Sequence, residues 1–130
     1  MSAPLSESLT HDEIQRAIVR SAHRLWPGID LQGSLSGVYL RGGAVEGRLM
    51  VLKGVEAGDP DLNGREIGSN GQPGFFIEVK TKGQNLSKVQ RARKAKLEAR
   101  GYVVFVVWSE EQALRDIASY LPIDWVAAHL

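Results

Sequence analysis

The chain has 130 residues, 43% of them hydrophobic and 24% charged, which fits a folded domain and excludes a disordered tail. It contains no cysteine, so disulfides and thiolate metal sites are excluded, and a net charge of only +1 does not by itself indicate a nucleic-acid partner. We expect residues 1–9 to be a flexible lead and residues 10–130 to form one domain. The longest apolar run, Tyr102–Trp108, is too short to span a membrane, and the N-terminus shows no signal-peptide pattern. A cytoplasmic protein is therefore expected.

A helix is predicted near the start of the chain. Thr10 and Glu13 form a capping-box pattern, and the apolar spacing that follows is helical until Trp26-Pro27-Gly28. The next stretch is rich in glycine and serine, and we expect a short strand at Gly37–Leu40. Leu49–Leu52 fits either a strand or a short helix.

The second half of the chain predicts strands and helices in alternation. Asn63-Gly64 reads as a break in the segment that begins at Asp61. Alternation, apolar runs and glycine or serine boundaries then predict a strand over Phe75–Lys80, a helix over Leu86–Arg100, a strand over Tyr102–Trp108 and a helix from Ser109 to about Leu121. This order predicts an α/β fold with a mixed central sheet flanked by helices.

Two acidic residues and a lysine are the candidates for chemistry. Glu78 and Lys80 point to one face of the predicted strand, whereas Val79 points to the other. Asp61 follows Pro60, whose ring restricts the backbone before it. Asp61 and Glu78 supply the hard oxygens that Mg²⁺ prefers, and the carbonyl of Val79 could add a third. Lys80 could then act on an attacking water or on the phosphate charge.

Gln90 and Glu13 are further candidates. Gln90 and Arg93 interrupt the face of the predicted helix that should pack on the sheet, and Gln90, close to the start of that helix, is placed to reach the site. Glu13 could be a helix cap or a third metal ligand, and the sequence leaves both readings open. The three histidines, His11, His23 and His129, have no metal-ligand spacing and are expected at the surface.

A basic segment follows the candidate site. Half of the 16 lysine and arginine residues lie between Lys80 and Arg100, against one acid, Glu98. Such a segment suits a phosphate backbone, although a solvated helix face would have the same composition. The candidate DNA-binding residues are Lys82, Lys88, Arg91, Arg93, Lys94 and Lys96, with Arg41 and Lys53 as possible extensions.

The ordered set Gly58-x-Pro60-Asp61, Glu78-x-Lys80 and Gln90 resembles the PD-(D/E)xK nuclease superfamily, and within it the VRR-NUC branch. The similarity runs from the first helix to about Leu121 and includes the Arg100-Gly101-Tyr102-Val103 phrase. It departs from the family pattern at Asp59, where a small or apolar residue is expected, and at Arg93-Lys94, where the helix is usually more apolar.

The resemblance implies a restriction-endonuclease-like three-layer core and DNA cleavage with Mg²⁺ or Mn²⁺. Asp61 and Glu78 correspond to the metal ligands of the family, Lys80 to its catalytic lysine, Gln90 to its motif glutamine and Glu13 to its first-helix glutamate. Small members resemble bacterial and phage enzymes that process branched DNA in repair and recombination and act as homodimers.

The resulting hypothesis is a metal-dependent, structure-selective DNA endonuclease acting on Holliday junctions, flaps or other branched DNA. Two alternatives stay open at this point: a non-catalytic nucleic-acid-binding module on the same fold, and a sequence-specific restriction endonuclease.

Overall fold

The computed structural model describes residues 9–34 and 57–130. The strand predicted at Gly37–Leu40, the segment Leu49–Leu52 and the candidate residues Arg41 and Lys53 lie outside the described residues. The described elements, in chain order, are α1 (His11–Leu25), β1 (Leu31–Gly33), β2 (Leu62–Gly64), β3 (Phe75–Val79), α4 (Lys88–Ala99), β4 (Val103–Val107), α5 (Glu110–Tyr120) and α6 (Trp125–Ala128). None of the helices in these ranges is long and apolar enough to cross a membrane.

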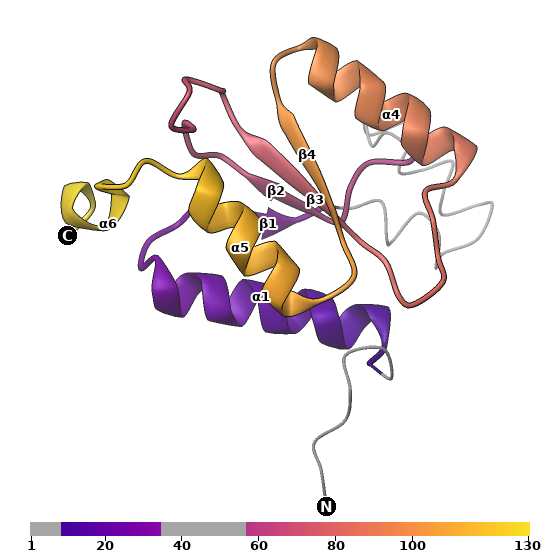
Figure 1. The fold of residues 1–130 in the computed structure, drawn as a ribbon, viewed down its shortest axis with the longest axis horizontal. Coiled ribbons are helices and arrows are strands. Elements are labelled where there is room, and N and C mark those ends of the chain that lie inside the picture. Colours follow the sequence, from indigo (N-terminus) through magenta and orange to yellow (C-terminus); the bar gives the residue numbers. More distant parts are fainter. Residues whose placement is uncertain (1–8, 35–56) are drawn as a thin grey trace, which may run out of the picture.

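The strands form one mixed sheet in the order β1-β2-β3-β4 (Figure 1). The β1–β2 and β2–β3 pairs are antiparallel, whereas β3 and β4 run parallel. The parallel pair requires a crossover, and α4 supplies it. The predicted α/β fold with a mixed sheet is therefore confirmed.

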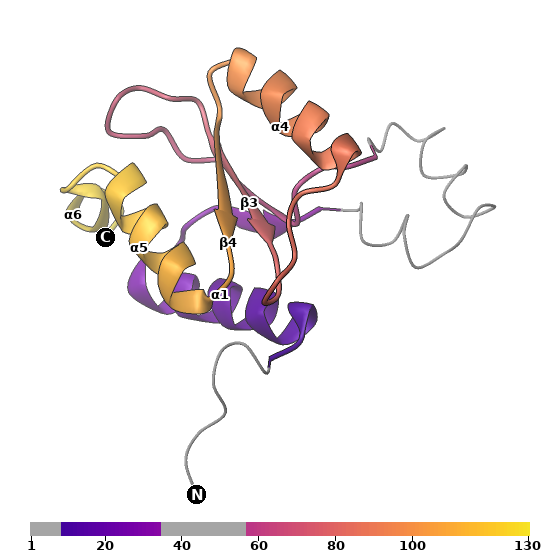
Figure 2. The ribbon, with the colours of Figure 1, turned by 45° about the vertical axis from the view of Figure 1, so that its right-hand side comes forward.

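Helices cover both faces of this sheet (Figure 2). On one face lie α1 and α5, which contact each other, and on the other lies α4. The hydrophobic core fills the α1/α5 side and is built from inward-facing residues of both helices and of all four strands, such as Ile14, Ile18, Ile77, Val79 and Ile117. Of the twelve residues of α4, all of them described, only Leu97 is buried.

Local signals explain where the helices begin and end. The side chains of Thr10 and Glu13 close the predicted capping box at the start of α1. A second capping box, between Ser87 and Gln90, opens α4. At its other end, Gly101 takes a positive φ of 92°, and the N–H groups of Gly101 and Tyr102 bond back to the last turn, as in a Schellman motif.

The structure corrects several predicted elements. Asn63-Gly64 does not break the chain but lies inside β2, where Gly64 leaves room for the ring of Phe75. Strand β1 was not predicted, and α4 begins at Lys88 instead of Leu86 because Ser87 caps it. Two of the missed elements are strands of only three residues, too short to show a period.

Candidate active site

Strand pairing brings Asp61 beside Glu78. In the antiparallel β2–β3 register, Leu62 lies opposite Ile77. Continuing that register by one residue places Asp61 opposite Glu78, and directly opposed residues point to the same face of a sheet. Because Leu62 and Ile77 point into the core, the two carboxyl groups lie on the other face, the one that α4 covers.

Glu78 is a buried acid beside a second acid. It is only 4% exposed, and the Asp61 side chain is 14% exposed. The pKa of Glu78 is raised to about 9, chiefly by burial and then by the charge of Asp61 and a hydrogen bond between the two carboxyl groups, against the opposing effect of Lys80. The pair therefore holds a proton at neutral pH that a divalent cation could replace.

Gln90 joins Lys80 to Glu78. The ammonium Nζ of Lys80 donates to Oε1 of Gln90 over 2.7 Å, and Nε2 of Gln90 donates to Oε1 of Glu78 over 3.0 Å. Oε1 of Gln90 also accepts the backbone N–H of Ser87 as part of the capping box. The same amide thus closes the start of α4 and fixes two of the candidate catalytic side chains relative to each other.

Two donors from different elements contact one oxygen of Asp61. The backbone N–H of Val79 donates to its Oδ2 over 2.7 Å, and Nε2 of His11 lies 3.1 Å from the same oxygen. His11 was expected as a surface residue, but its side chain is only partly exposed and its contact with Asp61 raises its pKa. No signal in the sequence predicts this contact, because His11 and Asp61 are distant in the chain and no motif links them.

The donor set fits a cation held by two protein carboxylates. No group of three His, Cys, Asp or Glu side chains among the described residues is arranged to hold a metal. Two carboxylates are nevertheless enough for Mg²⁺, which keeps several of its waters and also binds substrate phosphate. Glu13 is exposed and hydrogen-bonded to Thr10 as a helix cap, and its role as a ligand, like that of the Val79 carbonyl, stays a prediction.

The two departures from the family pattern contact each other. Arg93 of α4 forms an ion pair with Asp59, and both side chains are largely buried. Next to this pair, Gly58 takes a positive φ of 80° and lies so close to Val89 that a Cβ at this position would meet it at 2.7 Å. The segment that carries Asp61 is therefore attached to α4 by a charge pair and a close contact. The DNA-binding role predicted for Arg93 is untested, and its guanidinium is already engaged.

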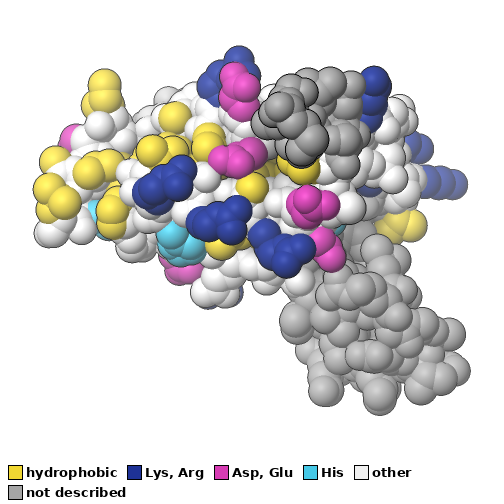
Figure 3. All heavy atoms as spheres, turned by 90° about the horizontal axis from the view of Figure 1, so that it is seen from below, with side chains coloured by type: hydrophobic (Ala, Val, Ile, Leu, Met, Phe, Trp, Pro, Cys, Tyr) yellow, Lys and Arg dark blue, Asp and Glu magenta, His cyan; other side chains and the backbone are white. Residues whose placement is uncertain are grey.

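The remaining basic candidates line α4 and the segment before it. Lys82, Lys88, Arg91 and Lys96 are exposed, whereas Lys94 pairs with Glu98 on the next turn. The opposite side of the molecule is different: where α1 lies, Lys and Arg side chains are interspersed with Asp and Glu, and hydrophobic side chains gather at the end with α6 (Figure 3). Within residues 9–34 and 57–130, the excess of positive charge therefore lies on α4 and the segment before it, near the candidate site.

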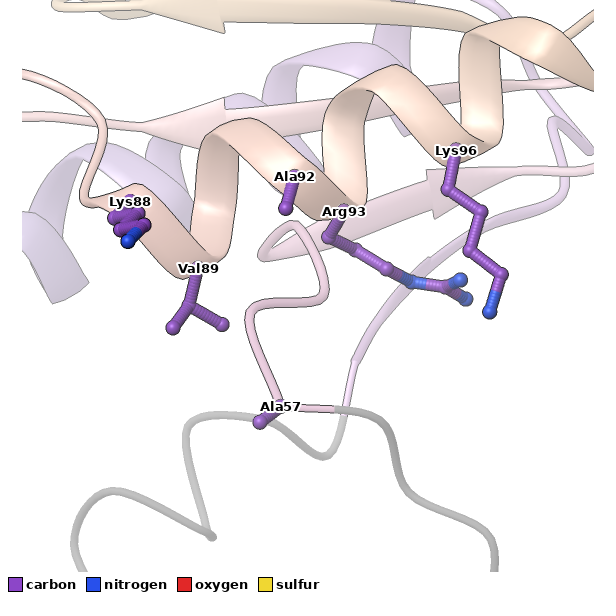
Figure 4. Close-up of a pocket in the computed structure, with 6 residues that line it drawn as sticks. All are labelled: Ala57, Lys88, Val89, Ala92, Arg93 and Lys96. Carbon is purple, nitrogen blue, oxygen red and sulfur yellow. The ribbon is translucent and has the colours of Figure 1, made fainter.

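A hollow of about 360 Å³ lies between α4 and the start of the Asp61 segment (Figure 4). Val89 and Ala92 face Ala57 across it, and the long side chains of Arg93 and Lys96 extend along its edge. The candidate carboxylates do not line this hollow. The hollow therefore lies between α4 and residue 57 and is separate from the carboxyl pair.

The comparisons with known proteins support the fold. The chain is similar to a solved structure described as "VRR_NUC domain protein", with a TM-score of 0.66 and 22% sequence identity over 87% of this chain and 88% of that one. No protein-family model and no curated protein matches the chain. At this level of identity the similarity shows a shared fold, and the resemblance to VRR-NUC domains read from the sequence is confirmed for the fold.

Proposed function

We propose that this protein is a metal-dependent DNA endonuclease that uses Mg²⁺ or Mn²⁺ and prefers branched substrates such as Holliday junctions or flaps. The observation that carries the proposal is the meeting of Asp61, Glu78, Lys80 and Gln90 on one face of the sheet. A binding module would not require a buried acid pair connected to a lysine, since phosphate binding needs only exposed positive charge.

Each side chain has a distinct task in phosphodiester hydrolysis. The carboxylates of Asp61 and Glu78 would hold the cation in place of their shared proton. When bound, a divalent cation lowers the pKa of its water and polarises the phosphate. Lys80, held by Gln90, would orient the attacking water or offset the negative charge that grows on the phosphate.

The surface of α4 would bind the phosphate backbone. Lys88, Arg91 and Lys96 are exposed on this helix, beside the site. Contacts of this kind position DNA without reading its sequence, which suits an enzyme that recognises shape. A role in DNA repair or recombination, and a homodimer that cuts two strands with one site from each protomer, belong to the same proposal.

The decisive experiment compares cleavage of a panel of DNA structures in Mg²⁺, Mn²⁺ and EDTA. Lys80→Ala and Glu78→Gln should abolish metal-dependent cutting but leave DNA binding in Ca²⁺ largely intact. The matched control is Arg115→Ala, because Arg115 is 71% exposed on α5, on the other face of the sheet. Undiminished cleavage by either site variant would reject the assignment.

The same panel separates the alternatives. DNA retained without cutting in any metal would favour a non-catalytic binding module. Discrete fragments from linear duplex, with no preference for branched DNA, would favour a sequence-specific restriction endonuclease. Replacing Lys88 and Lys96 by glutamate should weaken binding of every DNA in the panel and reduce its salt dependence, because these residues would contact phosphates only.

A further inference from the structure

His11 stands on a rigid support. It is the first residue of α1, directly after the cap residue Thr10, and the two hydrogen bonds of the capping box fix the first turn of the helix. One and two turns further on, Ile14 and Ile18 anchor α1 in the core with at most 1% exposure. The helix that carries the imidazole is therefore anchored in the hydrophobic core.

Asp61 lies in a segment that needs such support. It precedes β2 and follows an irregular stretch in which Gly58 has a positive φ. The continued strand register places its backbone, but the orientation of its carboxylate depends on the groups that hydrogen-bond to it. Besides its hydrogen bond with Glu78, the Asp61 carboxylate is contacted by the backbone N–H of Val79 in β3 and by His11 of α1, and both of these contacts end on Oδ2. Fixing one oxygen from two sides restricts the positions open to the other, Oδ1.

The hydrogen bond also defines the ring. Because the carboxylate of Asp61 can only accept, Nε2 of His11 carries the proton and donates it. The second ring nitrogen, Nδ1, lies 3.5 Å from Oδ1 of Asp12, so the imidazole is located between two acids. Partners that orient a ligating carboxylate in this way are typical of metal sites, and losing such a partner weakens metal binding.

We propose that His11 is a positioning residue of the cation site, which orients Asp61 so that Asp61 and Glu78 can share one divalent cation. This inference rests on the proposed metal-dependent function, but it concerns a residue that the resemblance to nucleases does not assign. His11 does not touch the reacting atoms in this proposal; it acts through Asp61.

Mn²⁺ binding measured by calorimetry, at constant pH and without DNA, tests the proposal on the whole chain. The variants are His11→Ala, which removes the donor, and His11→Gln, whose amide N–H can replace it. His23→Ala is the control, since His23 lies exposed in the last turn of the same helix. Circular dichroism and thermal melting in EDTA establish that each variant is folded.

We expect His11→Ala to bind Mn²⁺ about tenfold or more weakly than the wild type, His11→Gln to recover part of that loss, and His23→Ala to match the wild type. In DNA cleavage, His11→Ala should lower kcat and leave KM unchanged. Mn²⁺ affinity of His11→Ala equal to that of the wild type would overturn the proposal, as would a glutamine variant that recovers nothing. If the alanine variant does not fold, a glutamine variant that binds Mn²⁺ more weakly than the wild type but more tightly than Glu78→Gln supports the proposal, and one that matches either of these two proteins overturns it.

The nuclease proposal and the proposed role of His11 can be rejected independently of each other. If the wild type binds Mn²⁺ but cuts no DNA, the enzyme assignment is wrong while the comparison of His11 variants still decides the role of His11. If the wild type cuts DNA and His11→Ala is unaffected in both assays, the role of His11 is wrong and the enzyme assignment stands.

Discussion

Replacing Glu78 by glutamine tests the electrostatics of the carboxyl pair. Burial and the neighbouring Asp61 raise the pKa of Glu78 from 4.5 to about 9. Between these values the folded protein keeps a proton that the unfolded chain has released. The free energy of unfolding must therefore fall as the pH rises through this range, because the unfolded state binds fewer protons than the folded state. Glutamine has no proton to release, so the variant lacks this contribution.

The size of the fall in the free energy of unfolding follows from the interval between the two pKa values of Glu78. Each pH unit between the two pKa values lowers the free energy of unfolding by up to about 1.4 kcal/mol. From about pH 5.5 to about pH 8, Glu78 should therefore destabilise the wild type by up to roughly 3 kcal/mol relative to the variant. The amide of glutamine can still accept the hydrogen bond that Gln90 donates to Glu78, so packing changes little.

Urea denaturation in EDTA, followed by tryptophan fluorescence at several pH values, measures this difference. Glu111→Gln serves as the control, since Glu111 is an acid of α5 whose side chain is 85% exposed. We expect the stability of Glu78→Gln relative to the wild type to grow with pH, and that of the control to stay constant. A pH-independent difference for Glu78→Gln would refute the reasoning. Added Mn²⁺ should stabilise the wild type more at pH 8 than at pH 6, because the cation must displace the proton, and should do little for the variant.

Three further sets of substitutions test other parts of the structure. In a double-mutant cycle by urea denaturation, Asp59→Ala and Arg93→Ala should show a coupling energy of about 1 kcal/mol, and additive losses would mean that their ion pair contributes nothing. Gln90→Ala should lower the free energy of unfolding by about 1 kcal/mol, because the helix cap is lost, and should also abolish DNA cleavage. Gln90→Glu should keep the cap but lose the cleavage activity. Cleavage by the glutamate variant would contradict the role of the amide donor. Gly64→Ala should destabilise the protein by about 1–3 kcal/mol, because a Cβ at this position meets the ring of Phe75, and an unchanged melting temperature would contradict that packing.

The long elements of the fold could be predicted because each carries a local signal. A capping box marks the start of α1, apolar runs mark β3 and β4, and Gly101 marks the end of α4. The short strands β1 and β2 could not, because three residues show no period and Asn63-Gly64 favours a turn on local grounds. Pairing with β3 on one side and β1 on the other keeps Asn63-Gly64 extended.

The residues of the candidate site could be predicted from the sequence, but most of the contacts between them could not. Glu78 and Lys80 share a strand face, so their proximity followed from the alternation of side chains. The position of Asp61 depends on the register of β2, and this strand was not predicted because Asn63-Gly64 favours a break in the chain. The contacts of His11 with Asp61 and of Arg93 with Asp59 join residues far apart in the chain, and no local pattern marks such pairs.

Because α4 buries so few of its residues, the residues that carry its positive charge are largely different from those that stabilise the fold. This helix presents most of the positive charge near the site yet places only Leu97 in the interior. Its outward positions can therefore be exchanged with little effect on folding. If the proposed function is correct, the DNA contacts could be redesigned on this helix alone, with α1, α5 and the sheet kept as a fixed scaffold.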